Sequence, residues 1–325
     1  MTIAIIGAGI AGAACSSALI RSNKSVVLFD KARAVGGRMS SKRCGGYYAD
    51  LGAQYFTARS EAFIAQCQQW LAQGAIASWQ PRIATLYDSL IPSPDTTKRF
   101  IGVPSMQKPI QQLLQNCDVK TQCHVDRVHY AQGRWQLYCA SELLGSFDTL
   151  VLAMPQQQAK TLLQLYSNDI PMWAEIFDLP ALLPCWAASI SLSAPVNSSF
   201  DAVFVRSHAA ISWLARQSTK PGRGEQESWV VHFSPVFSKS HLNASEEFIA
   251  QIAVSELQKV LDQPLQVKSL LCHRWRYAVL SEQYQSRGAV WLPGVNLGLC
   301  GDWLAGGRVE NAWMSGQQLA EAILA

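Results

Sequence analysis

The chain has 325 residues, of which 49% are hydrophobic and 15% charged, so we expect a compact globular protein and exclude a disordered one. The formal net charge is +4, and no run of Lys or Arg is long enough to predict a nucleic-acid or membrane surface. The nine cysteines form no CxxC pair and are odd in number. This favours reduced thiols in a cytoplasmic protein, with no disulfide framework and no metal site.

The first thirty residues predict a βαβ unit. Residues 2–6 form a short apolar run with β-branched side chains, which is typical of a buried strand. Residues 10–22 are small and apolar, as expected of a helix that lies close to a sheet, and 26–29 form a second strand. The glycines and Arg21 interrupt the opening apolar run, so we expect neither a signal peptide nor a spanning helix.

A glycine pattern connects this first strand to the first helix. Gly7 allows a tight turn, Gly9 allows the backbone to approach a pyrophosphate, and Gly12 allows the helix to pack against the strand. The free amides and dipole of the helix N-terminus favour phosphate. Asp30 ends the second strand, where a carboxylate can accept both ribose hydroxyls. The unit therefore predicts a dinucleotide site.

Two further segments favour FAD over a nicotinamide cofactor. Gly36 and Gly37 form a second loop that permits close approach of a long ligand, and Arg38 can reach a phosphate. An extended FAD needs such a loop, whereas a nicotinamide dehydrogenase does not. At the end of the chain, Asp302 follows the last predicted strand and can accept hydrogen bonds from the ribityl chain. The helix predicted over 309–324 can direct its first amides toward the flavin ring.

The middle of the chain interrupts this dinucleotide-binding sheet twice. We expect a helix over 61–72, a strand over 83–86 and a helix over 105–115 with Ser105 as its N-cap. An amphipathic helix is expected over 245–261, with Ser245 as its N-cap. Strand-like pieces alternate with polar loops from about 170 to 231, and the loop 218–224 is expected to be exposed. The predicted fold is α/β, with a discontinuous Rossmann-type FAD-binding domain and a second, sheet-rich substrate domain. The first comprises residues 1–70, 99–160 and 266–325; the second comprises 71–98 and 161–265.

Several motifs together resemble the bacterial renalases, which are small relatives of the flavin-containing amine oxidases. Besides the two glycine loops, they are Ala-Asp-Leu-Gly-Ala-Gln-Tyr at 49–55, Val-Leu-Ala-Met-Pro at 151–155, His-Arg-Trp-Arg-Tyr-Ala at 273–278, Gly-Asp-Trp at 301–303 and Gly-Arg-Val-Glu at 307–310. The resemblance spans nearly the whole chain. It implies a fold similar to p-hydroxybenzoate hydroxylase with FAD bound non-covalently. It also implies an oxidase that takes hydride from misreduced (1,2- or 1,6-dihydro) NAD(P) and passes the electrons to oxygen, giving NAD(P)+ and hydrogen peroxide.

The motifs and this resemblance together predict the cofactor contacts. The residues expected at FAD are Gly7, Gly9, Ile10, Ala11, Gly12, Asp30, Lys31, Gly37, Arg38, Met39, Gly52, Ala53, Gln54, Val125, Asp302, Val309, Glu310 and Ala312. Ala53 and Gln54 are expected to bring backbone amides to the isoalloxazine.

The substrate pocket is expected to be aromatic. A dihydronicotinamide gains aromaticity when it loses hydride, so it needs a stacking surface more than an acid–base dyad. Candidates are Tyr55, Trp213, His232, Trp275 and Tyr277. Each aromatic residue is equally suited to a core position, and a lone histidine in a strand is often structural.

Alternatives remain open at this point. The N-terminal motifs also permit a flavin-dependent amine oxidase, although no Ser-Gly-Gly-Cys type stretch for covalent attachment is present. A flavin-binding protein without turnover is the third possibility. Arg206, Arg216 and Arg223 are either contacts for a substrate phosphate or solvated surface charges.

Overall fold

Both ends of the chain build one six-stranded sheet in the computed structural model, which describes residues 1–282 and 286–325. All neighbouring strands are parallel except the last pair at one edge. The order across the sheet is β19 (Ala289–Leu292), β20 (Leu297–Cys300), β13 (Thr149–Leu152), β1 (Thr2–Ile6), β2 (Ser25–Phe29) and β9 (Asp118–Lys120). The predicted βαβ opening and returning last strand are therefore present, and with them the Rossmann-like arrangement.

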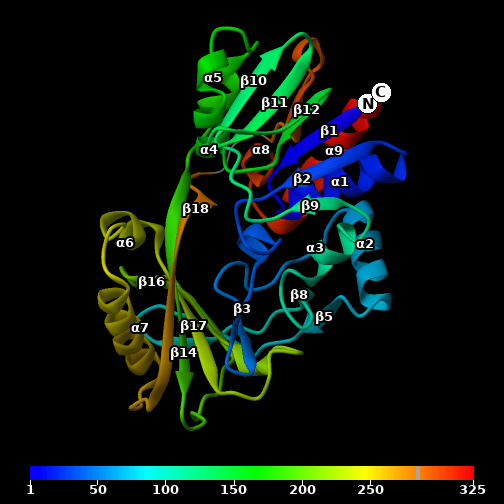
Figure 1. Ribbon diagram of the computed structural model, residues 1–325. Coiled ribbons are helices and arrows are strands. Elements are labelled where there is room, and N and C mark those ends of the chain that lie inside the picture. Colours follow the sequence, from blue (N-terminus) through cyan, green and yellow to red (C-terminus); the bar gives the residue numbers. More distant parts are fainter. Residues whose placement is uncertain (283–285) are drawn as a thin grey trace.

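The first and last long helices pack side by side on one face of this sheet (Figure 1). These helices are α1 (Ile10–Arg21) and α9 (Val309–Leu324). Further helices on this side of the molecule are α2 (Glu61–Ala72) and α3 (Lys108–Leu113). The short α8 (Asp302–Ala305) contacts α9 and directs Trp303 and Leu304 into a second core. The hydroxyl of Ser60 accepts a hydrogen bond from the Phe63 amide and so caps α2.

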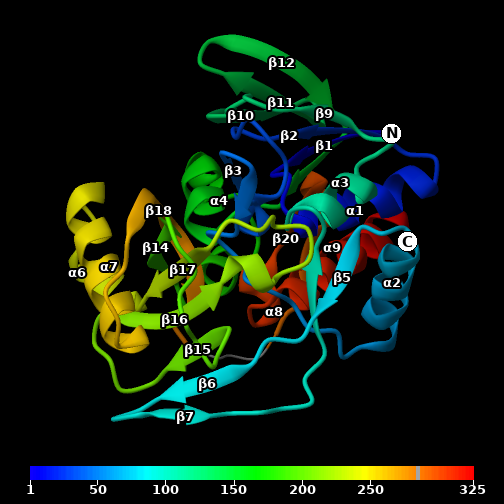
Figure 2. The same ribbon diagram turned by 90° about the horizontal axis from the view of Figure 1, so that it is seen from below.

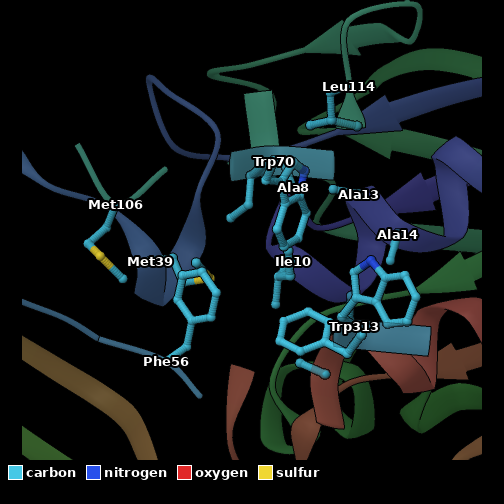
Figure 3. Packing of buried hydrophobic residues seen from close by; sticks show 14 of the residues in the cluster. Ala8, Ile10, Ala13, Ala14, Met39, Phe56, Trp70, Met106, Leu114 and Trp313 are labelled. Atoms are coloured by element: carbon cyan, nitrogen blue, oxygen red, sulfur yellow. The ribbon is translucent and has the colours of Figure 1, made fainter. Parts of the chain in front are cut away.

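The core beneath these helices combines small and very large side chains. Ala13 and Ala14 of α1 are fully buried and allow close approach, while Phe63, Trp70 and Trp313 fill the remaining space. Figure 3 shows Trp70, Trp313 and Phe56 gathered around Ile10. This packing holds the N-terminus of α1, and therefore the glycine loop, in a rigid setting.

The opposite face of the six-stranded sheet is covered by a small antiparallel sheet and two short helices. Their buried side chains form a second core with Phe29, Leu150 and Trp303. The elements are β10 (Arg127–Ala131), β11 (Arg134–Cys139), β12 (Glu142–Phe147), α4 (Gln156–Leu162) and α5 (Trp173–Phe177).

A seven-stranded sheet forms the second layer, with a third core between it and two helices on its outer face (Figures 1 and 2). The strand order is β18 (Val267–Leu280), β14 (Leu182–Leu192), β17 (Ser228–Phe233), β16 (Ile211–Arg216), β15 (Ala202–Val205), β6 (Ile83–Leu86) and β7 (Leu90–Pro92). The helices are α6 (Pro235–Ser240) and α7 (Glu246–Leu261), and Ser245 caps α7 as predicted.

Short elements connect the two layers. Two small sheets pair β3 (Lys42–Cys44) with β4 (Tyr47–Ala49), and β5 (Ile76–Trp79) with β8 (Arg99–Gly102). Four single turns of 3-10 helix complete the set: η1 (Gly37–Met39), η2 (Gln164–Tyr166), η3 (Gln217–Thr219) and η4 (Pro293–Val295). No helix in the described part of the chain is long and apolar enough to cross a membrane.

The structure corrects several sequence-based boundaries. Strand β18 belongs to the seven-stranded sheet, so the change of layer falls near residue 280 and not at 266. Residues 161–177 pack in the second core, so the substrate layer begins at β14 and not at 161. Helix α3 begins only at Lys108, and the Ser105 side chain does not cap it. Instead the Ser105 carbonyl accepts the Lys108 amide in a turn that precedes the helix.

Candidate functional site

The first glycine loop has the geometry that a bound pyrophosphate requires. A Cβ on Gly12 would lie 2.0 Å from the Gly7 carbonyl oxygen, so any side chain there would separate α1 from the loop. Gly9 has open space at its Cβ position. It is the N-cap of α1 without a side-chain hydrogen bond, and the first turn contains no acidic residue. No capping or acidic side chain therefore competes for the first amides of α1, and an anionic ligand can bind there.

Asp30 fixes this loop from the end of β2. One carboxylate oxygen accepts the Ala8 amide and the other accepts the Ala32 amide, each at 2.7 Å. The carboxylate is thus oriented before any ligand arrives. Each oxygen retains acceptor capacity for a ribose hydroxyl.

The second glycine loop lies directly against the first. A Cβ on Gly37 would be 3.3 Å from the Gly9 Cα, and the Gly36 amide donates to the Ala8 carbonyl at 2.9 Å. Met39, at the end of η1, is buried in the adjoining core. The two loops therefore form one continuous backbone surface beside the N-terminus of α1.

Arg38 and Asp302 pair with each other across the site. The guanidinium makes two hydrogen bonds to the carboxylate, one of them 2.9 Å long between Nη1 and Oδ2, and a third to the Ala278 carbonyl at 3.0 Å. Burial opposes the charge of Arg38, but Asp302 outweighs this effect, so the pKa of Arg38 is raised. The pair ties the second glycine loop to the end of β18 and to α8. Contacts of Arg38 with a phosphate and of Asp302 with a ribityl chain remain predictions.

Residues 50–54 form a wall between the glycine loops and the seven-stranded sheet. The Ala53 amide donates to the Arg38 carbonyl at 2.9 Å. This amide is thus bonded within the protein, and the approach of Ala53 and Gln54 to the isoalloxazine stays a prediction. A Cβ on Gly52 would lie 2.0 Å from the Arg38 oxygen. The wall therefore packs on the second loop with no room for a side chain.

His232 and Trp275 both reach the same carbonyl in this wall. Trp275 Nε1 donates to the Leu51 oxygen at 2.9 Å, and His232 Nε2 lies 3.1 Å from that oxygen. Burial lowers the pKa of His232 to about 4, an effect that the bond to Leu51 only partly offsets. The imidazole is therefore neutral at ordinary pH, with its proton assigned to Nε2 by this contact. His232 anchors the wall and is poorly suited to act as a base.

A row of side chains crosses the seven-stranded sheet on the side of this wall. Strand register places Phe204, Trp213 and His232 next to one another on β15, β16 and β17. Residues directly opposite in register share one face of a sheet. Tyr55 packs against Trp213 with ring centroids 5.8 Å apart and the rings tilted by 53°, and the Arg99 guanidinium lies 5.1 Å from the Tyr55 centroid. Four of the five pocket candidates, Tyr55, Trp213, His232 and Trp275, are thus brought together around the wall.

Tyr277 is the candidate that lies apart. It packs against the second core, on the side of the six-stranded sheet away from α1. Tyr277 therefore packs β18 against that core and is not part of the aromatic row.

The Glu310 side chain is bonded within the protein. Its Oε1 accepts the Ser60 amide and hydroxyl at 2.7 Å and the Arg59 amide at 3.1 Å. The side chain thus binds the N-terminus of α2, and a contact of Glu310 with FAD stays a prediction. The bond joins segments 250 residues apart, which no local pattern indicates.

The remaining predicted cofactor residues are distributed around the loops. Ile10, Ala11 and Ala312 are buried between α1 and α9, and Val309 is partly buried beside them. Val125 is buried in the second core, and Lys31 is exposed beyond Asp30. Their contacts with FAD remain predictions.

The sequence missed a buried charged cluster behind the wall. We use the name Asp50 cluster for Asp50, Lys220 and Arg223, whose side chains are all 0% exposed. The expectation that the loop 218–224 is exposed is therefore wrong for its two cations. One signal was available: an aspartate within the apolar segment 49–51 needs a cation when it is buried. Among the other arginines, Arg216 pairs with Glu227 and Arg206 lies over the Phe204 ring.

Comparisons with known proteins agree with this architecture. Residues 5–69 match the NAD(P)-binding Rossmann-like domain, and residues 88–324 match the family described as flavin containing amine oxidoreductase. Renalase from Mus musculus is 22% identical over 307 residues, which cover 88% of this chain and 87% of the mouse protein.

Solved structures extend the likeness to the whole fold. An oxidoreductase from Methanosarcina mazei has a TM-score of 0.75 at 10% identity, covering 99% of this chain and 100% of its own. Cyclohexylamine oxidase from Brevibacterium oxydans IH-35A has a TM-score of 0.74 at 10% identity, covering 99% and 98%. At such low identity these two similarities concern the fold alone.

Proposed function

Because this chain belongs to the flavin containing amine oxidoreductase family and is a homologue of renalase, we propose that it is an FAD-dependent oxidase of misreduced NAD(P). It is an oxidoreductase, and not the flavin-binding protein without turnover that the sequence left open. The reaction removes hydride from the 1,2- or 1,6-dihydro isomer and reduces oxygen to hydrogen peroxide, with one proton taken up. FAD, when bound, accepts the hydride and passes its two electrons on to oxygen.

The contact between the two glycine loops is the observation that carries this proposal. Gly37 rests on Gly9, the α1 amides face outward beside them, and Asp30 is oriented by two amides. A long dinucleotide can lie along this continuous backbone with its pyrophosphate at the helix. The residues present therefore fit FAD bound without a covalent link.

The chemistry of the aromatic row supports a dihydronicotinamide substrate. Loss of hydride restores aromaticity, so the protein has to stack and orient the ring and has little need to move a proton. Burial lowers the pKa of His232 to about 4, and its ring is bonded to the Leu51 carbonyl. His232 is therefore a poor proton acceptor. Tyr55, which is half-buried and packs against Trp213, offers a flat surface on which a nicotinamide can stack.

An anaerobic spectral assay tests this function directly. Purified protein reconstituted with FAD is mixed with the 1,2-dihydro isomer, the 1,6-dihydro isomer or ordinary 1,4-NADH, and bleaching of the flavin band is followed. We expect either misreduced isomer to bleach the flavin at least tenfold faster than 1,4-NADH, with peroxide formed when oxygen is readmitted. Equal bleaching by all three contradicts the proposed specificity.

Variants connect the assay to the site. Replacing Tyr55 by Leu removes the stacking surface, so the bleaching rate constant is expected to fall at least tenfold. The matched control is Tyr87→Leu, which removes an aromatic ring that is 53% exposed and should leave the rate unchanged. The family also contains amine oxidases, so primary amines and polyamines form the second arm. Peroxide release with an amine, and none with the dihydro isomers, would favour an amine oxidase.

A further inference from the structure

The Asp50 cluster contains more positive than negative charge. Asp50 Oδ2 accepts Lys220 Nζ at 3.0 Å, and Arg223 Nε lies 3.0 Å from both carboxylate oxygens. Arg223 also donates to the carbonyls of Gly102 at 2.8 Å and Pro104 at 2.6 Å. All three charged side chains are 0% exposed. Two cations thus share one carboxylate in a place that water does not reach.

Within residues 1–282 and 286–325, the other groups around Lys220 carry no charge that balances this excess. The amide oxygens of Gln54 and Gln217 accept Lys220 Nζ at 3.1 and 3.4 Å, and the Trp79 ring centroid is 4.9 Å away. His232, on β17, is neutral at ordinary pH. On the other side of Asp50, the Ser41 hydroxyl donates to Oδ1. The cluster and its neighbours therefore carry one net positive charge.

The ionisation states of the cluster preserve this charge at neutral pH. Burial opposes the charge on Asp50, but Lys220 and Arg223 outweigh it and lower the pKa of the carboxyl group. Burial also lowers the pKa of Lys220 to about 8, although Asp50 offsets part of the effect. A buried, unbalanced cation is costly to maintain. Its retention therefore points to a use in the function of the protein.

The position of the cluster indicates what that use is. Asp50 begins the wall of residues 50–54, and Gln54 at its end is bonded to Lys220. The wall packs on the Arg38 carbonyl of the second glycine loop. The excess charge therefore lies immediately behind the segment that faces the expected flavin site, separated from it by one layer of chain.

We propose that Lys220 is a positioning and electrostatic residue for hydride transfer: it holds Gln54 in place and supplies the positive charge that stabilises the negative charge arriving with the hydride. A hydride carries two electrons and one proton, so the substrate becomes a cation and the acceptor gains one negative charge. A fixed cation in a site of low dielectric constant favours that product. This inference rests on the proposed binding of FAD.

The reduction potential of the bound flavin tests the charge without any substrate. The FAD-reconstituted protein is equilibrated with a redox dye and a chemical reductant at pH 7. Lys220→Met should shift the equilibrium toward oxidised flavin on the order of tenfold, which corresponds to about 30 mV for a two-electron couple. Lys220→Arg keeps the charge and should retain the potential, and Lys239→Met, at an exposed lysine on α6, should also leave it unchanged. A wild-type potential in Lys220→Met overturns the proposal.

A second measurement covers the case in which Lys220→Met does not fold. In the wild-type protein, loss of the Lys220 proton above about pH 8 should make the potential fall more steeply with pH, because reduction then takes up an additional proton. The proposal is overturned if the slope of the flavin reduction potential against pH does not change between pH 7 and 9. Neither measurement uses a dinucleotide substrate. A potential that responds as expected in a protein that does not oxidise the dihydro isomers would refute the proposed substrate alone, and a protein that binds no flavin would refute both.

Discussion

The contact between Glu310 and the start of α2 makes a sharp prediction about stability. Glu310→Ala removes an acceptor that binds the Ser60 amide, the Ser60 hydroxyl and the Arg59 amide. The carboxylate also faces the positive end of the α2 dipole. Because Glu310 lies in the first turn of α9 and Ser60 precedes α2, this one side chain connects two helices that pack in the main core.

The magnitude follows from the number and surroundings of the donors. Hydrogen bonds to a charged group contribute about 1.5–3 kcal/mol each, which sets an upper range of several kcal/mol for three. Arg59 is exposed and Ser60 half-buried, so water replaces part of what is lost. We therefore expect Glu310→Ala to reduce the free energy of unfolding by about 2–4 kcal/mol. Glu310→Gln, which retains one acceptor oxygen, should cost about 1 kcal/mol.

Urea unfolding of the flavin-free protein, followed by tryptophan fluorescence, measures these changes, and titration with FAD measures affinity separately. Glu321→Ala removes an exposed acidic residue from the same helix and should change stability by less than about 0.5 kcal/mol. The reasoning is refuted if Glu310→Ala is as stable as Glu321→Ala. It is also refuted if Glu310→Gln unfolds like wild type but binds FAD more than tenfold more weakly, because the side chain would then belong to the cofactor site.

Two further predictions concern the wall. Gly52→Ala places a Cβ 2.0 Å from the Arg38 carbonyl oxygen, so we expect a loss of about 1–3 kcal/mol and weaker FAD binding, measured by thermal unfolding with and without FAD. The control is Gly294→Ala, whose Cβ would have open space; equal effects of both substitutions would contradict the steric argument. His232 has a pKa of about 4 in the folded protein against 6.5 for the free side chain, so the unfolded chain binds this proton more readily and stability should fall as pH decreases from about 6.5 to about 4. In His232→Gln that part of the acid sensitivity should be absent, and parallel loss of stability in the two proteins over this range would show that another group is responsible.

Several elements followed from local sequence alone. The bounds of α2 and α9 agree with the predicted helices at Glu61–Ala72 and Val309–Leu324, and β6 agrees at Ile83–Leu86. Their signals are apolar periodicity and caps, which act within a few residues. In the first glycine loop the motif, its strand and its helix are neighbours in the chain, so one pattern describes both the fold and the expected ligand.

Long-range pairing decided the other elements. Strand β18 was not predicted, because its exposed and half-buried residues carry no clear alternation, and its pairing with β14 joins segments far apart in sequence. The domain boundary near 266 was wrong for the same reason. A strand at the edge of a sheet is specified mainly by its partner, and only weakly by its own composition.

The sequence by itself determined the dinucleotide-binding unit, because Gly7, Gly12 and Asp30 act through backbone geometry that neighbouring residues set. Only the tertiary structure decided the state of the charged residues. Lys220 and Arg223 stand in a polar, glycine-containing loop that is indistinguishable from a solvated one until Asp50, 170 residues away in the chain, is placed against it. Burial and ion pairing depend on which segments meet in space. The residues next to a charged side chain in the sequence therefore do not identify its partner.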